Sequence, residues 1–170
     1  MTSAELLAQA FDRIQQLVHQ ALDGIGSREL TARIDPDANT IAWLVWHLTR
    51  VQDDHVAEVA GHRQVWHEGG WADKFGLPFD PDATGYGQSS TDVGQVAPSS
   101  IEPLISYHDA VYERTRDYVA GLTDSDLERV VDESWDPPVT LGTRLISVIS
   151  DDLQHIGQAS YVRGVVTRQS

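Results

Sequence analysis

The sequence predicts an all-α protein: a four-helix bundle, mainly antiparallel, with a long aromatic-containing connection between the second and third helices. Four stretches carry apolar residues at intervals of three and four, the period of a helix with one buried face. Capping and helix-breaking residues flank these stretches. No strand pattern, repeat or low-complexity segment stands out. At 170 residues, the chain is most simply one domain, residues 1–170.

The helices can be placed from these signals. The first is expected over about residues 3–23, because Thr2 and Glu5 form a capping box and Gly24 ends the pattern. The second begins after Asn39 or Thr40 and stops at Gly61. We expect the third over about 100–121, a short helix at "TDSDLERVV" (123–131), and a last long helix from the Thr140 cap to about 166.

About forty residues, from Gly61 to Pro98, join the second and third helices. Irregular segments of this length inside a compact domain are uncommon and often functional. This one is rich in Gly, Pro and Asp but also holds five aromatic residues: Trp66, Trp71, Phe75, Phe79 and Tyr86. We expect it to fold against the bundle. It is either a small additional core or a lid over a site, and the two interpretations are compatible.

Composition excludes several function classes. The net charge of −14, with Lys74 as the only lysine, argues against nucleic-acid binding, because an acidic chain repels phosphate. There is no cysteine, so zinc-finger and protein-thiol chemistry are excluded. No apolar run reaches the roughly 18 residues of a membrane helix. The first residues lack the pattern of a secretory signal, so we expect a cytoplasmic protein that does not bind membranes.

The last helix carries an unusual polar strip. Asp151, His155 and Gln158 are spaced by four and three residues, so their side chains lie on one face, on the same side as Arg144. Apolar residues flank the strip. A polar strip with apolar flanks on a bundle helix needs partners, because buried polar groups must be satisfied.

A matching group is expected on the second helix. His47 lies in the apolar context "WLVWHLTRV" and is expected to point inward. Together with Asp151 and His155 it would provide two imidazoles and one carboxylate on facing helices, a three-ligand metal site with an open position. This set suits Zn²⁺, Ni²⁺, Fe²⁺ or Mn²⁺, of which we expect Zn²⁺ or Ni²⁺.

Spacing alone suggests supporting roles for Asp54, Gln158 and Arg144. Asp54, seven residues after His47, could be a fourth ligand or orient its ring. Gln158 could orient Asp151 or a bound water, and Arg144 could steady an anionic molecule. The alternative for the site as a whole is that the inward histidine is a hydrogen-bonded core residue. Surface or loop roles are expected for the remaining histidines at positions 19, 62, 67 and 108, and a rim position for His55.

Three segments resemble the DinB/YfiT-like metalloenzymes, specifically the actinobacterial branch related to mycothiol-dependent enzymes. They are "WLVWHLTRVQDDH", "FGLPFDPDATGYG" and "DDLQHIGQASYVRG", and the resemblance covers nearly the whole chain. It implies a four-helix bundle whose metal is held by one His of the second helix and two residues of the last, at i and i+4. These positions fall on His47, Asp151 and His155. The middle residue is commonly His in the family, whereas a related metal-binding domain uses Glu there.

The resemblance also implies a function. Several relatives are thiol-dependent transferases or isomerases, so we expect a metal-dependent thiol S-transferase or a related hydrolase, using mycothiol or a similar thiol and a small-molecule substrate. It further implies a homodimer formed through helices, for which the apolar stripe of the first helix is suited. The alternative is a non-catalytic bundle that binds a small molecule or a metal.

Overall fold

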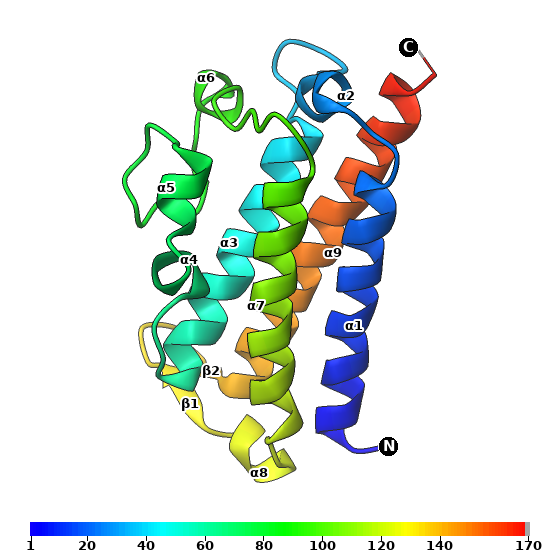
Figure 1. The fold of residues 1–170 in the computed structure, drawn as a ribbon. Helices are drawn as coiled ribbons and strands as arrows, with labels where there is room; N and C mark the ends of the chain where they lie inside the picture. Colours follow the sequence, from blue (N-terminus) through cyan, green and yellow to red (C-terminus); the bar gives the residue numbers. More distant parts are fainter. Residues whose placement is uncertain (169–170) are drawn as a thin grey trace.

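The computed structural model describes residues 1–168 and confirms the all-α prediction (Figure 1). Long helices are α1 (Ser3–Leu22), α3 (Ile41–Ala60), α7 (Glu102–Ala120) and α9 (Leu141–Val166). The short elements are α2 (Ser27–Thr31), α4 (Val65–Glu68), α5 (Trp71–Phe75), α6 (Ser90–Val93), α8 (Asp124–Leu127), β1 (Val130–Asp132) and β2 (Val139–Thr140). Within residues 1–168, no helix combines the length and apolar character needed to cross a membrane.

The long helices lie side by side, with α1 and α3 each packed against both α7 and α9. Figure 1 shows that α1 and α9 run in one direction and α3 and α7 in the other. Neighbours α1/α7 and α3/α9 are therefore antiparallel, whereas α1/α9 and α3/α7 are parallel. The prediction of a mainly antiparallel bundle therefore holds for α1/α7 and α3/α9 but not for α1/α9 and α3/α7.

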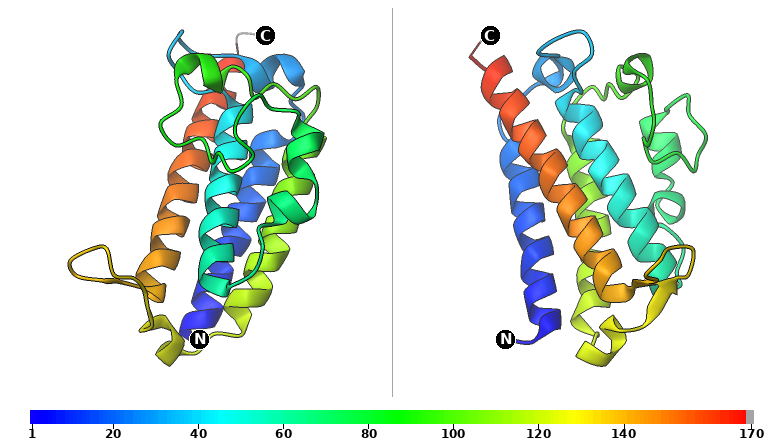
Figure 2. Two further views of the ribbon diagram at one scale, coloured as in Figure 1. Left: turned by 90° about the vertical axis from the view of Figure 1, so that its left-hand side faces the viewer. Right: turned by 180° about the vertical axis from the view of Figure 1, so that it is seen from behind.

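The parallel pair α3/α7 explains the long connection. Helix α3 ends at the opposite end of the bundle from the start of α7, so the chain has to return along the whole bundle (Figures 1 and 2). It does so through α4, α5 and α6. Trp66 and Trp71 are buried, and both rings contact Tyr107 of α7, with centroids 5.1 and 5.4 Å from it. The connection folds against the bundle, as the sequence analysis expected.

Local sequence sets the helix ends. Thr2 and Glu5 form the predicted capping box of α1. The hydroxyl oxygens of Thr40 and Thr140 accept hydrogen bonds from the backbone N–H groups at the starts of α3 and α9. Gly61 ends α3 in the left-handed conformation, with φ of 73°. These caps fix where α3 and α9 begin, and so which of their residues face each other.

The segment after α7 corrects one prediction. The helix expected over residues 123–131 ends at Leu127, and Val130–Asp132 instead forms β1, paired with β2 in an antiparallel hairpin. The β-branched pair Val130-Val131 favours the strand, and the backbone N–H of Leu141 donates to the carbonyl of Arg129, tying the hairpin to the start of α9. The prediction of no β-strands is therefore wrong for the short β1/β2 hairpin.

Candidate metal centre

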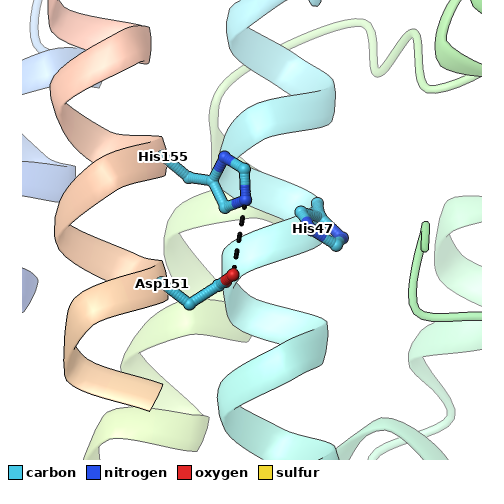
Figure 3. A group of neighbouring side chains, drawn as sticks. All are labelled: His47, Asp151 and His155. Atoms are coloured by element: carbon cyan, nitrogen blue, oxygen red, sulfur yellow. Dashed lines mark ion pairs between the residues drawn. The ribbon is translucent and has the colours of Figure 1, made fainter. Parts of the chain in front are cut away.

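His47 of α3 and Asp151 and His155 of α9 converge between the two antiparallel helices (Figure 3). One ligand atom of each lies within 4.8 Å of the others. His47 is buried, whereas the side chains of His155 and Asp151 remain 19% and 35% exposed. The group therefore has a buried side and a side open to solvent.

The ring of His47 is held in one orientation. Its Nδ1 lies 2.6 Å from the carbonyl oxygen of Thr84, and because a carbonyl can only accept, Nδ1 carries the hydrogen. The other nitrogen, Nε2, is then the one with a free lone pair. The ring also stacks on Trp43, with centroids 4.5 Å apart and planes at 16°. Burial, reinforced by His155, lowers the pKa of His47 against the opposing effects of Thr84 and Asp151.

His155 and Asp151 form an ion pair, with Nε2 of the ring 3.6 Å from Oδ1 of the carboxylate. The opposite nitrogen, Nδ1, lies 3.1 Å from Oε1 of Gln158. The hydrogen bond with Asp151 is the main reason why the pKa of His155 is raised. Burial alone would raise the pKa of Asp151, but its hydrogen bond with His155 and the charges of the nearby imidazoles lower it overall. The carboxylate is therefore ionised and available as a ligand at neutral pH.

The donor set fits a divalent cation. Both imidazoles direct Nε2 away from their supporting hydrogen bonds. Oδ2 of Asp151 is buried and has no hydrogen-bond partner within the described residues, which is unusual for a carboxylate oxygen. Ligand atoms at about 2.1 Å from one ion are at most about 4.2 Å apart, so binding requires ligand atoms that are 4.8 Å apart to close by at least about 0.6 Å. Three protein ligands leave room for a further ligand on the exposed side.

Residues 81–88, which we call the strap, cover the buried side of this centre. Thr84 supplies the carbonyl for His47, and Oε1 of Gln88 accepts from Nε1 of Trp43 at 2.7 Å. Gly85 has φ of +99°, and a Cβ added there would lie 2.7 Å from Nδ1 of His47. Only glycine allows the strap to approach the ring so closely.

Buried polar residues of α3 anchor the strap. Nε of Arg50 donates to the carbonyl of Ala83 at 3.1 Å, and its guanidinium lies over the ring of Trp66. Nε1 of Trp66 donates to the carbonyl of Pro81 at 2.9 Å. Asp53 accepts from the backbone N–H groups at the start of α4 and pairs with Arg50 at 3.8 Å. The connection therefore packs as a small additional core, and its strap lies against the candidate centre.

The three residues that the sequence analysis assigned to supporting roles, Gln158, Asp54 and Arg144, do not all make the contacts that were expected. Gln158 contacts His155 rather than Asp151. The structure does not support an orienting role for Asp54, because Oδ1 of Asp54 accepts from Nε2 of Gln64 at 2.6 Å while Thr84 orients His47. Arg144 lies on the expected side of α9, where it pairs with Glu58 at 2.8 Å and Asp132 at 3.2 Å.

Two buried titratable groups were not recognised from the sequence. His108, assigned to a surface or loop role, is fully buried, with Nδ1 3.1 Å from the hydroxyl of Thr49, and burial lowers its pKa to about 4. Asp152 is also fully buried beside Asp151, and burial raises its pKa well above the ordinary value. Both are therefore neutral in the folded protein at pH values where exposed groups of the same type would be charged or partly charged.

The sequence gives only a weak indication that Thr84 and Gly85 lie against His47. Sequence reasoning placed both in the segment "FGLPFDPDATGYG" without assigning them a role. The Gly-rich end of that segment was the only local indication that the backbone approaches something closely there.

Comparison with known proteins identifies the family. The sequence profile of the DinB superfamily matches residues 10–159, and the chain belongs to this superfamily. The crystal structure of a conserved protein from Enterococcus faecalis superposes with a TM-score of 0.89 at 26% sequence identity, covering 96% of each chain. No curated protein matches the sequence. The DinB-like part of the predicted resemblance is therefore confirmed.

Proposed function

We propose that this protein is a metal-dependent enzyme that transfers a small-molecule thiol, of the mycothiol type, to a small electrophile. His47, Asp151 and His155 would hold one divalent cation, with Zn²⁺ or Ni²⁺ expected from the donor set. A cation bound there would lower the pKa of a coordinated thiol, so that the thiolate is present at neutral pH. The observation that carries the proposal is the convergence of three ligand atoms, one each from His47, Asp151 and His155, within 4.8 Å of one another, with Oδ2 of Asp151 lacking a hydrogen-bond partner among the described residues.

The chain's own residues have defined tasks in this proposal. Thr84 holds His47 with Nε2 unprotonated. Gln158 orients the ring of His155, whose Nε2 would give up the proton that it shares with Asp151 when the cation binds. Trp43 and the strap exclude water from the buried side, while the exposed sides of Asp151 and His155 leave access for substrates. The thiol has to come from a co-substrate, because the chain contains no cysteine. In the transfer, a sulfur–carbon bond forms, the bond from carbon to the leaving group breaks, and the thiol proton passes to solvent.

The test begins with metal content. Protein purified without a nickel column is measured by mass spectrometry and titrated with Zn²⁺ and Ni²⁺ by calorimetry. We expect about one ion per chain, bound at least about tenfold more weakly by His155→Asn. His19→Asn is the matched control, because His19 pairs with Asp109 on other helices, outside the centre. Failure of the wild type to bind either ion would refute the metal site.

Activity is measured separately. The metal-loaded protein is mixed with mycothiol and 1-chloro-2,4-dinitrobenzene, and thiol consumption is compared with the uncatalysed rate. We expect acceleration in the wild type and in His19→Asn but not in His155→Asn. A protein that binds metal and still consumes no thiol above background would contradict the enzymatic proposal, and would favour a binding function.

A further inference from the structure

The antiparallel helices α3 and α9 line two hollows, and the three candidate ligands lie between them along the helices; we call the surface that holds both hollows the groove. On α3 the order is Leu44, then His47, then Asp54 to Glu58. On α9 the same order, read backwards along the chain, is Tyr161 and Val162, then His155 and Asp151, then Arg144. Each hollow is therefore lined by both helices, and the metal centre separates them.

The hollow on the Leu44 side is mostly apolar, with a volume of about 520 Å³. Its apolar lining consists of Ile34, Ala38, Leu44, Gly157, Tyr161 and Val162. Ile34 and Tyr161 are 40% and 67% exposed, so an apolar molecule in the hollow would cover their exposed surface. Gln158, which also lines this hollow, contacts the ring of His155. The apolar hollow therefore opens directly beside a candidate ligand.

The cleft on the other side has a volume of about 610 Å³ and is lined mainly by polar and charged residues. It is lined by two carboxylates (Asp54 and Glu58), two guanidinium groups (Arg63 and Arg144) and three imidazoles (His55, His62 and His67). Nη1 of Arg144 lies 3.1 Å from Nδ1 of His55, so His55 accepts this hydrogen bond and its Nε2 carries a hydrogen.

We propose that the groove binds two different molecules on opposite sides of the metal centre: an apolar electrophile in the hollow beside Leu44 and Tyr161, and a polar thiol in the cleft beside His55 and Arg144. Both volumes lie within the range of roughly 300–1,000 Å³ that is typical of small-molecule sites. The carboxylates and guanidinium groups of the cleft balance, which favours a polar thiol with both donors and acceptors and no large net charge. The inference rests on the proposed function, because it assigns the two substrates of that reaction.

Distances along the helices are compatible with this division. Tyr161 is six residues beyond His155, and Arg144 is seven residues before Asp151, which correspond to about 9 and 10 Å along α9. The candidate ligands line neither hollow themselves, so a molecule anchored in either one would have to extend about 10 Å along α9 to place its reacting atom at the centre. Separate hollows also allow both molecules to be bound at once, which a transfer reaction requires.

The first experiment tests the apolar hollow without any metal. The neutral dye N-phenyl-1-naphthylamine, whose fluorescence rises in apolar surroundings, is titrated into the wild type and two variants. We expect saturable binding that Tyr161→Asp weakens by about tenfold or more, because it places a charge in the hollow. Leu153→Asp is the matched control, since Leu153 is 41% exposed on the same helix but lines neither hollow. Equal weakening by both variants, or no binding by the wild type, would overturn the proposal.

The second experiment tests simultaneous binding. Cysteine, a polar thiol whose charges balance, is titrated into the Co²⁺-loaded protein and followed by the sulfur-to-cobalt absorption band, with and without saturating dye. We expect the affinity for cysteine to change by less than about twofold when the dye is present, and to be unaffected by Tyr161→Asp. Mutual exclusion of the two probes would show a single shared pocket and overturn the proposal.

These measurements separate the two proposals. Absence of metal binding in the calorimetry described above removes the proposed function, whereas dye binding still reports on the apolar hollow. Light scattering on the same samples measures the oligomeric state and tests whether a second copy of the chain, rather than a small molecule, covers the apolar hollow. If both Tyr161→Asp and Leu153→Asp convert a dimer into a monomer, this face of α9 is an interface between copies, and the assignment of the hollow to an electrophile is wrong.

Discussion

Replacing Gly85 with alanine should weaken metal binding through the strap, without touching a ligand. Gly85 has φ of +99°, outside the region that alanine adopts readily. A Cβ at this position would lie 2.7 Å from Nδ1 of His47, 3.0 Å from Trp46 and 3.2 Å from Trp43. The rings are packed in the core, so the strap has to move away. Thr84 then loses its hydrogen bond to His47.

The magnitude follows from these two effects. A strained backbone residue of this kind costs about 1–3 kcal/mol of folding free energy. Loss of the hydrogen bond that orients a metal-binding histidine typically lowers metal affinity by about 10–100-fold. We therefore expect Gly85→Ala to lose about 1–3 kcal/mol of stability in urea denaturation, and to bind Zn²⁺ about 10–100-fold more weakly in calorimetry.

Gly87→Ala provides the matched control. Gly87 lies two residues further along the strap with φ of +71°, and a Cβ there would have no neighbour within 4 Å. This variant should lose about 1–2 kcal/mol of stability from backbone strain and keep the metal affinity of the wild type. The reasoning would be refuted if Gly85→Ala bound Zn²⁺ as tightly as Gly87→Ala does.

Three further predictions concern the buried charges and the ligands. The unfolded chain protonates His108 near pH 6.5, whereas the folded protein does so only at about pH 4, so this group contributes stability that is lost as pH falls through that window. The loss should be on the order of 3 kcal/mol and absent from His108→Asn; parallel urea-denaturation profiles of the two proteins against pH would contradict it. Arg50→Met should destabilise the protein by about 3–5 kcal/mol, because it leaves Asp53 charged and buried, and an unchanged urea midpoint would exclude this role. Asp151→Asn should lower the pKa of His155 toward its ordinary value of 6.5 in an NMR titration of the metal-free protein, whereas an unaltered titration would show that Asp151 is not the cause of the shift.

The helical period explains why the convergence of the three candidate ligands could be predicted. Asp151 and His155 are one turn apart on α9, and an inward direction for His47 follows from the apolar residues around it. The same rule was misleading for Asp54, which shares the direction of His47. Seven residues correspond to about 10 Å along the axis, too far for a side chain to reach the same ring. Angular position is a local property, whereas contact also depends on height along the helix.

The support of His47 could not be predicted, because it comes from the connection. Thr84 is 37 residues from His47 in the sequence and uses a backbone carbonyl, a group that every residue carries. His108 was missed for a related reason: its partner Thr49 lies on another helix, and its neighbours Tyr107 and Asp109 gave no clear apolar context. Contacts that depend on tertiary packing leave little trace in the periodicity of a single segment.

The same-direction arrangement of α3 and α7 has a consequence for redesign. A helix as long as α3 spans about 30 Å, and the returning segment has to cover this distance whether or not a site is present. Within that return, Thr84 contacts His47 and Gln88 contacts the Trp43 ring stacked on it, while Trp66 holds the strap through the carbonyl of Pro81. A redesign of the connection therefore has to keep α4, which anchors the strap and satisfies the buried Asp53, and Trp71, which packs on Tyr107; residues outside these anchors can be changed to alter what surrounds the groove.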